Sequence, residues 1–288
     1  MILNKFFSVI FSILLLAISC EAFAYSVCDA RGVLFEFEKT PRCATVVPAV
    51  SQNIFALGAE ENLVANSRFC NIPKEAKLKI KIGGFIDPDY EKILEIKPDV
   101  VILPTTKESR IEKRLEKLGI KSFVLHSEGI KYISADIRML GKLLQKEALA
   151  NKIADEFDSI ISTNFDAGKN RRAIFMFGKM ASGKGSFVGD ILSACGLKNC
   201  AEKIGVPWAE VSKEFVLTAR PEVIFVEVAN DSARIQAEKF YKTDPIWRTT
   251  PAVKNNAIYF IPRNLVIVPS VRVVEAVKLM RSYLSKNK

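Results

Sequence analysis

The alternation of apolar segments constrains the fold of this 288-residue chain more than any other feature. Short β-type runs alternate with helical patterns from residue 45 to 125 and again from 172 to 284. Between them, residues 132–165 contain no proline and a single glycine, and apolar residues recur at helical spacing from Ile153. Strands that alternate with helices predict parallel sheets covered by helices on both faces. The sequence therefore predicts two α/β lobes separated by a long helical segment.

The predicted elements define the domain organisation. We expect a hairpin over 26–37, then strands at 45–47, 62–65, 77–82, 99–103 and 121–125, with helices at 50–57, 88–96 and 108–118. The second lobe is predicted to contain strands at 172–177, 223–228 and 257–261 and helices at 186–195, 211–219, 244–249 and 269–284. The helix predicted at 147–167 would be about 30 Å long and rigid. The lobes are thus expected at 25–131 and 169–288, with the linking segment at 132–168.

The first 24 residues are typical of a cleaved secretory signal peptide. Lys5 precedes an apolar run over 6–18, which is shorter than the roughly 20 residues that span a bilayer. Ala22-Phe23-Ala24 then supplies an A-x-A cleavage signal, so the mature chain is expected to begin at Tyr25. This predicts export to the periplasm. A membrane anchor, or a lipoprotein anchored at Cys20, is the alternative interpretation.

The charge balance narrows the choice of partners. The chain has 42 Lys and Arg against 32 Asp and Glu, a formal net charge of +10, and 49% of its residues are hydrophobic. This composition excludes a disordered chain, and export together with the even spread of basic residues argues against nucleic acid. His126 is the only histidine, which argues against a histidine-rich metal site or a histidine-based catalytic triad.

Five cysteines follow the predicted signal peptide, in a compartment that permits disulfides. We expect the pairs Cys28–Cys43 and Cys195–Cys200, which leaves Cys70 over, although sequence does not fix the connectivity. No C-x-x-C spacing is present, so neither a thioredoxin-like site nor a zinc ribbon is supported.

A glycine-rich segment at 178–186 follows a predicted strand and matches the G-x-x-x-x-G-K pattern of phosphate-binding loops. Gly185 stands where such a loop needs Ser or Thr for magnesium, so a nucleotide site is disfavoured. We expect a loop that faces a cleft, with Lys179 and Lys184 either attracting an anionic ligand or solvated. A second strand-to-helix turn, Gly83–Pro88, is predicted to form a cleft wall.

Six segments in chain order resemble the helical-backbone receptors of ABC importers, which serve cobalamin, ferric siderophores and haem. The segments are Thr45–Gly58, Arg68–Pro73, Asp87–Ile102, Val206–Glu214, Asp244–Trp247 and Ala252–Asn256. The segment 206–214 is similar to receptors for cobalamin in particular. The resemblance extends from about residue 26 to the C-terminus.

This resemblance implies a class III periplasmic binding protein-like α/β fold, with two Rossmann-like lobes joined by one long rigid α-helix. It implies a solute receptor that binds a chelated metal compound between the lobes, without catalysis, resident metal or cofactor, and delivers it to an ABC permease and its ATPase. A corrinoid is favoured, and ferric siderophore or haem is the alternative within the family. An exported α/β enzyme such as a metal chelatase is the alternative of another class. The receptor is expected to be a monomer that binds no nucleic acid.

By position in the matching segments, the resemblance implies that Glu91 and Glu214 contact arginines of the permease. Exposed carboxylates near helix N-termini pair with arginine and steer docking. The alternative is that each glutamate only favours the first turn of its helix through the helix dipole.

Ligand contacts are predicted in the loops at strand ends, because ligands bind at the carboxyl ends of strands in open α/β sheets. The candidates are Ser51, Gln52, Phe69, Cys70, Phe85, Thr105, Thr106, Met180, Ser182, Lys184, Trp208, Asn230, Arg263, Asn264 and Leu265. Trp208 would either stack on a flat macrocycle or pack in the core. Trp247 is predicted to be a core residue, and Arg272 to line the cleft or cap the last helix.

Cys70 and His126 are residues of types that can bind a metal directly. Cys70 is interpreted as a free buried cysteine, with a thiolate ligand to a soft metal as the alternative. His126 ends a predicted strand and is interpreted as a loop histidine with satisfied hydrogen bonds, with an axial imidazole ligand as the alternative. The sequence lacks a G-x-S-x-G nucleophile elbow, so no catalytic residues are predicted.

Overall fold

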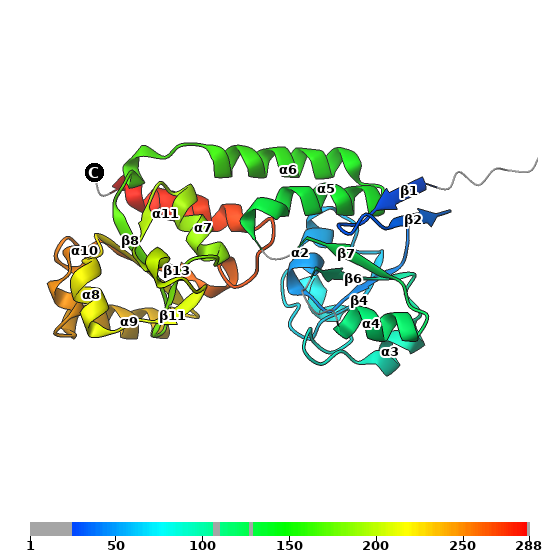
Figure 1. Cartoon of the computed structure of the whole chain (residues 1–288), viewed down its shortest axis with the longest axis horizontal. Coiled ribbons are helices and arrows are strands. Elements are labelled where there is room, and N and C mark those ends of the chain that lie inside the picture. The colour runs from blue at the N-terminus through cyan, green and yellow to red at the C-terminus, as the bar shows by residue number, and fades with distance from the viewer. Residues whose placement is uncertain (1–24, 106–109, 127–128, 287–288) are drawn as a thin grey trace, which may run out of the picture.

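The computed structural model describes residues 25–105, 110–126 and 129–286. The predicted signal peptide, Cys20 and Thr106 lie outside these residues. Two separate sheets build two lobes, which are bridged along one side by helices α5 (Ile133–Leu143) and α6 (Glu147–Ser162) (Figure 1). The two-lobed α/β fold predicted from the alternation of strands and helices is confirmed.

The first lobe contains a five-stranded parallel sheet in the order β5-β4-β3-β6-β7. Its strands are β3 (Cys43–Thr45), β4 (Leu63–Asn66), β5 (Ile80–Lys81), β6 (Val100–Pro104) and β7 (Ser122–Leu125). Helices α2 (Pro48–Ala56) and α5 cover one face, and α3 (Tyr90–Ile96) and α4 (Arg110–Lys117) cover the other. An antiparallel hairpin of β1 (Tyr25–Cys28) and β2 (Leu34–Phe37) precedes this sheet, as predicted.

The second lobe contains a six-stranded mixed sheet, in which β10 pairs with β8 beside the path β11-β9-β8-β12-β13. Its strands are β8 (Arg172–Phe177), β9 (Met180–Ser182), β10 (Lys198–Asn199), β11 (Trp208–Glu210), β12 (Val223–Val228) and β13 (Ile258–Pro262). Strands β8, β10, β12 and β13 are parallel, and β9 and β11 are antiparallel to their neighbours. The antiparallel strands differ from the purely parallel sheet that the sequence predicts.

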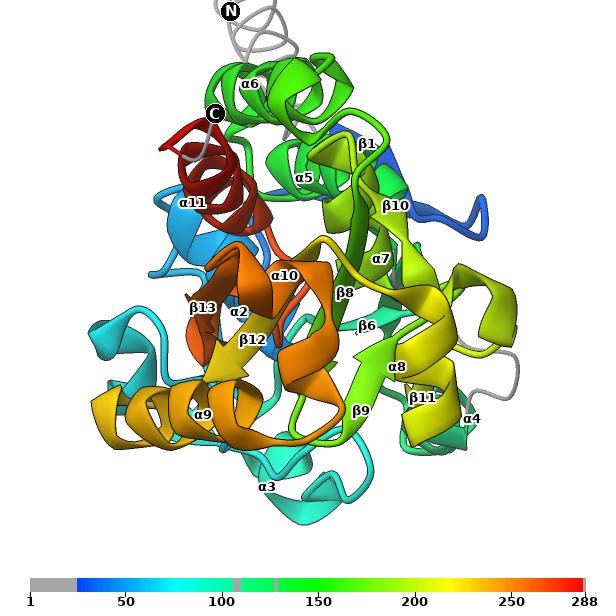
Figure 2. The ribbon, with the colours of Figure 1, turned by 90° about the vertical axis from the view of Figure 1, so that its left-hand side faces the viewer.

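Helices cover both faces of this second sheet, which Figure 2 shows from its own side of the molecule. Helices α7 (Phe187–Ala194) and α11 (Val273–Lys286) pack on one face. Helices α8 (Lys213–Ala219), α9 (Asp231–Thr243) and α10 (Pro251–Lys254) pack on the other. Helix α9 was not predicted, because its apolar residues are sparse and only Tyr241 is buried. Trp247 is 7% exposed and contacts Tyr241 edge to face, which confirms it as a core residue.

Six short 3₁₀ helices connect the described elements, at Lys74–Leu78, Ile130–Tyr132, Asp166–Gly168, Cys200–Ile204, Trp247–Thr249 and Arg263–Leu265. The predicted strand at 77–82 shortens to β5, and the helix predicted at 244–249 is one of these turns. Helix α6 ends at Ser162 rather than at 167, because Thr163 has extended backbone angles and both its N–H and its hydroxyl bond to the Ser159 carbonyl.

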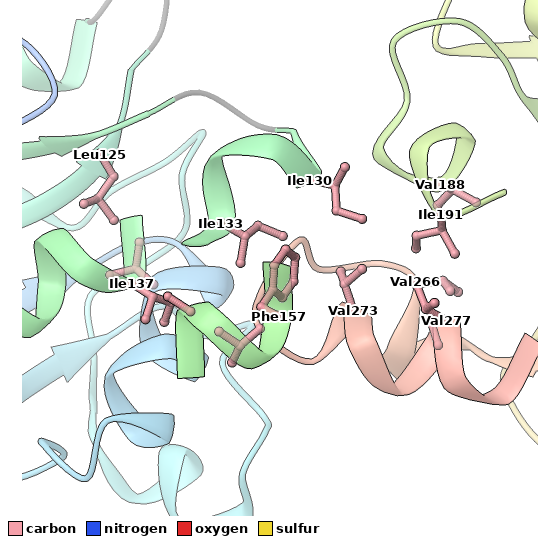
Figure 3. Close-up of a cluster of buried hydrophobic side chains, with 14 of the residues drawn as sticks. Leu125, Ile130, Ile133, Ile137, Phe157, Val188, Ile191, Val266, Val273 and Val277 are labelled. Atoms are coloured by element: carbon pink, nitrogen blue, oxygen red, sulfur yellow. The ribbon is translucent and has the colours of Figure 1, made fainter. Parts of the chain in front are cut away.

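One apolar core runs through both lobes. Leu125 and Ile137 of the first lobe, Phe157 of α6 and Val273 and Val277 of α11 belong to a single buried cluster (Figure 3). Helix α6 therefore does more than connect two independent units, since it packs against α5 on one lobe and α11 on the other. Lobes that share a core resist large relative motion, because interiors are close-packed.

Candidate functional site

The carboxyl ends of the first sheet open on a cavity between the lobes. This cavity of about 160 Å³ is lined by residues at or just after the ends of β3, β6 and β7, among them Val47, Pro104 and His126. Its opposite wall is residues 267–269, which connect β13 to α11 in the second lobe. A cavity at the carboxyl ends of strands is where open α/β sheets bind ligands.

A larger cavity of about 630 Å³ continues along the second lobe. Phe177 at the end of β8, Met180, and Trp208 on β11 form its wall, and Trp208 packs edge to face on Phe177 at 4.9 Å between ring centroids. Ile267 and Pro269 line both cavities. We call these two neighbouring cavities together the cleft.

His126 is held in place at the first-lobe wall of the cleft. Its Nδ1 lies 2.6 Å from Asp136 Oδ1, and its backbone N–H donates to the same oxygen at 3.0 Å. The imidazole stacks on the Tyr132 ring with centroids 5.0 Å apart. Burial raises the pKa of Asp136, and the hydrogen bonds from His126 oppose that rise. The Asp136 carboxylate is thus the hydrogen-bond partner of the Nδ1 atom of His126.

Of the residues predicted to contact ligand, Met180 and Trp208 line the cleft. Phe69 and Phe85 are exposed side chains of the first lobe, with the Arg68 guanidinium 4.8 Å from the Phe69 ring. Thr105 is exposed, and its hydroxyl donates to the Leu125 carbonyl at 2.8 Å. These three lie at the surface rather than in the wall of either cavity.

Four of the residues predicted to contact ligand are buried inside the protein. Ser51 is fully buried and accepts a hydrogen bond from Asn66, and Cys70 is 1% exposed. Ser182 is fully buried on β9, where its hydroxyl has no hydrogen-bond partner among the residues that the structure describes. Gln52 faces the other lobe, where the Ser270 hydroxyl bonds to its side-chain oxygen at 2.6 Å. These side chains point into packed interiors, although they lie close to strand ends in sequence.

Two of the remaining candidates, Asn230 and Arg263, have partners within their own lobe. Asn230 caps α9 by accepting from the Ala233 N–H, and Arg263 forms a two-point ion pair with Glu227, whose side chain is 5% exposed. Lys184, Asn264 and Leu265 do not line either cavity among the described residues. Arg272 pairs with Glu275 in the first turn of α11.

The segment at 178–186 is a tight hairpin rather than a phosphate loop. Gly178 and Lys179 turn the chain from β8 into β9, which pairs antiparallel with β8. Ser186 then caps α7 by accepting from the Gly189 N–H at 3.0 Å. Gly185 and Ser186 line the larger cavity, so the prediction that this segment faces a cleft is confirmed.

The cleft also has walls that the sequence did not indicate. Residues 267–269, Phe177, Phe187 and Pro207 line it, although they were not among the candidates. Phe177 is the last residue of a predicted strand, and that position could have suggested it. The segment 267–269 gave no such signal, because an apolar connection between strand and helix is equally expected to pack in the core.

The expected disulfides do not form among the described residues, where all five cysteines are free thiols. The Cys195 thiol lies 3.9 Å from the Val277 carbonyl of α11, and the Cys200 thiol lies 3.9 Å from the Ala219 carbonyl of α8. The two side chains therefore face different helices despite their closeness in sequence. Cys28 is exposed, whereas Cys43 is buried at the start of β3.

Glu91 and Glu214 occupy equivalent positions on the two lobes. Each lies in the first turn of its helix, behind a capping residue: Asp89 accepts from Lys92 N–H on α3, and Ser212 accepts from Phe215 N–H on α8. Both glutamates are exposed. Backbone N–H donation lowers the pKa of Glu214, so its carboxylate is charged at neutral pH. The two helices lie on different lobes, away from α6 (Figure 1).

The described residues contain neither a membrane-spanning helix nor a cluster of metal-binding side chains. No helix over 25–105, 110–126 and 129–286 is long and apolar enough to cross a membrane. Within the same ranges, no three His, Cys, Asp or Glu side chains gather as a metal site would require.

Comparisons with known proteins agree with this geometry. The chain is 26% identical over 236 residues to a vitamin B12-binding protein of Pectobacterium atrosepticum, covering 76% of this chain and 81% of that protein. Its fold matches the periplasmic vitamin B12 binding protein of Vibrio cholerae with a TM-score of 0.71, 22% identity, and coverage of 86% and 98%. It also matches a periplasmic heme-binding protein of Roseiflexus, in apo form, with a TM-score of 0.71, 18% identity, and coverage of 86% and 99%.

The family described as periplasmic binding protein matches residues 44–265, which is more than half of the chain. The match begins at β3 and ends at the turn that follows β13, so it includes both sheets and the helices that bridge them. The two-lobed architecture, the cleft at the sheet ends and this match lead to one conclusion: the chain belongs to the periplasmic binding protein family.

Proposed function

We propose that this protein is an extracytoplasmic receptor that binds a chelated metal compound in the cleft and delivers it to an ABC permease and its ATPase. The observation that carries the proposal is the cleft itself, because both lobes contribute a wall and Phe177 and Trp208 offer aromatic surface. Ligand sites are mostly apolar and concave, and aromatic rings stack on flat macrocycles. The protein would act in the periplasm and would need neither catalysis nor a resident cofactor.

A corrinoid is the favoured ligand. The curated relatives at 26–27% identity are named vitamin B12-binding proteins, and Trp208 of the segment at 206–214 is among the residues that line the larger cavity. Haem and ferric siderophores are the alternatives within the same family, since solved structures with this fold include heme-binding proteins.

Titration of the purified protein tests this assignment. We expect cyanocobalamin to quench tryptophan fluorescence saturably at micromolar concentration or below, because Trp208 is in the cleft. Bound ligand should also raise the melting temperature, since a ligand at 100 times its dissociation constant adds about 2.7 kcal/mol of stability.

Haemin and a ferric siderophore, titrated in the same way, separate the ligands within the family. Free tryptophan amide is the control for absorption of the excitation light by coloured ligands. If none of the three compounds binds saturably, the proposed function is wrong. Turnover of any of them to a product would instead favour the exported enzyme.

A further inference from the structure

We propose that His126 binds the metal of the transported compound, by donating the Nε2 lone pair to an open axial position. The inference rests on the proposed function, because it concerns a ligand bound in the same cleft. His126 follows β7 at the carboxyl edge of the first sheet, and it faces residues 267–269 across the smaller cavity. It is the one imidazole in the sequence, and the fold places it in the cleft.

The contacts of the ring fix its orientation. Asp136 lies 2.6 Å from Nδ1 and also accepts the His126 backbone N–H at 3.0 Å, so the carboxylate is fixed relative to the main chain. The Tyr132 ring lies almost parallel to the imidazole, with 3° between their planes. A carboxylate that accepts from Nδ1 selects the tautomer with its lone pair on Nε2, which is how proteins orient histidines that bind metals.

The second nitrogen is available to a ligand. Among the described residues, Nε2 has no hydrogen-bond partner, and the imidazole is 32% exposed while the Asp136 side chain is 14% exposed. The same small cavity is lined by the apolar side chains of Leu125, Ile133 and Ile267. His126 therefore lines a cavity whose other polar lining side chains are Asn53 and its own partner Asp136.

The chemistry points to a metal chelate with an exchangeable axial water. Imidazole suits cobalt and iron, which are the metals of corrinoids and haem. As the bond from Nε2 to the metal forms, the bond from the metal to water breaks, and the water leaves with no change of oxidation state. The Nδ1 proton stays in its hydrogen bond with Asp136. His126 cannot coordinate a chelate whose axial positions are blocked, so it adds no affinity for such a compound.

Three probes test the inference: aquacobalamin and ferric protoporphyrin IX, which carry exchangeable axial water, and cyanocobalamin, which does not. We expect the wild-type protein to shift the visible absorption band of aquacobalamin or of ferric protoporphyrin IX, and to leave that of cyanocobalamin unchanged. The compound that shifts identifies the metal. Affinity for the shifted compound should exceed the affinity for its blocked counterpart, cyanocobalamin or cyanide-bound haem.

Variants separate coordination from folding. His126→Ala should abolish the spectral shift and weaken binding of the shifted compound by about tenfold or more, and added imidazole should restore the shift. His126→Gln, which keeps bulk and polarity, should behave like His126→Ala. Asp136→Asn should keep the shift with an affinity about 10–100-fold lower. Glu147→Ala, an exposed residue of α6 that lines neither cavity, should match wild type.

The outcomes distinguish this inference from the proposed function. If the protein binds exchangeable and blocked chelates equally, without a spectral shift, His126 is not a ligand but the receptor function stands. A shift that persists in both His126→Ala and His126→Gln also overturns the inference, and leaves His126 at most as a hydrogen-bond donor. If none of the three probes binds saturably, this inference fails, and the proposed function then depends on the titration with the ferric siderophore.

Discussion

At the residue scale, burial separates side chains that the sequence alone presents as equivalent. Trp208 and Trp247 are the two tryptophans, and each follows or lies next to a proline-containing turn. Trp208 is 37% exposed and lines the cleft, whereas Trp247 is 7% exposed and packs on Tyr241. The first is available to a ligand, and the second contributes to the core.

Replacing the two tryptophans should therefore affect different properties of the protein: ligand binding for Trp208 and stability for Trp247. Trp208→Ala is expected to weaken ligand binding about tenfold or more with little change in unfolding free energy, because it removes aromatic surface from the cleft. Trp247→Ala is expected to lower the free energy of unfolding by about 3–5 kcal/mol. Calorimetric titration measures the ligand affinity, and urea unfolding measures the free energy of unfolding. Equal destabilisation by both changes would contradict the assignment of Trp208 to the cleft wall.

The cysteines should also differ in reactivity. Burial raises the pKa of the Cys195 thiol to about 12, and a raised thiol pKa means less reactive thiolate at any given pH. At pH 8 we expect a chromogenic disulfide reagent to label exposed Cys28 rapidly and Cys195 only after unfolding. Cys28→Ser is the control that should remove the fast phase. Rapid labelling of two or more thiols in folded Cys28→Ser protein would show that the buried thiols are accessible.

At the element scale, helix α2 contacts the opposite lobe through polar side chains. Gln52 accepts from Ser270, and Asn53 accepts from the Val271 N–H at 3.1 Å. All three side chains that take part, those of Gln52, Asn53 and Ser270, are buried. A buried hydrogen bond between lobes fixes their relative position, because breaking it leaves polar groups without partners.

A double-mutant cycle tests this connection. Gln52→Ala and Ser270→Ala should each lower the unfolding free energy by about 1–3 kcal/mol, since each leaves a buried group without its partner. The double variant should be less destabilised than the sum of the two, with a coupling of about 0.5–3 kcal/mol. Urea unfolding measures all three. Additive effects would mean that the two side chains do not interact in solution.

Helices α3 and α8 present their first turns in the same way, one from each lobe. We expect the double replacement Glu91→Ala and Glu214→Ala to weaken binding to the permease about tenfold or more, because exposed carboxylates steer and pair with arginine. Ligand affinity and melting temperature should be unchanged. Glu147→Ala, an exposed glutamate in the first turn of α6, is the matched control. Transport and permease binding that survive the double replacement would contradict the docking proposal.

At the scale of the whole molecule, a single core joins the two lobes. Phe157 on α6 is 3% exposed and belongs to the same cluster as residues of both sheets and of α11. Helix α6 lies along both lobes, and residues 267–271 cross back from the second lobe to α2 (Figure 1). The two lobes are therefore coupled at two places, at α6 and at residues 267–271.

This coupling predicts one cooperative unfolding transition. Phe157→Ala should lower the unfolding free energy by about 3–5 kcal/mol and should move the melting of both lobes together. Scanning calorimetry and hydrogen exchange of amides in β6 and β12 measure it. Phe215→Ala on α8, which lies in a cluster confined to the second lobe, is the comparison. Two separate transitions in the wild-type protein would show that the lobes fold independently.

The sequence by itself determined the two α/β lobes, the helical bridge and the family resemblance. These depend on local periodicity, as in the apolar strands at 99–103 and 223–228, and on segments of contiguous residues. The boundaries were less well determined: α6 ends five residues before its predicted end, and the sparse apolar face of α9 gave no helical signal.

The tertiary structure alone decided which residues form the cleft. His126 and Asp136 lie ten residues apart, and Gln52 and Ser270 lie 218 residues apart. Their closeness to strand ends in the sequence predicted that Ser51 and Ser182 would lie at the cleft. In the structure, both side chains are buried in the interior. Periodicity fixes which face of an element is apolar, whereas a binding site needs side chains from several elements to meet. That meeting depends on how the two lobes pack around α6 and residues 267–271.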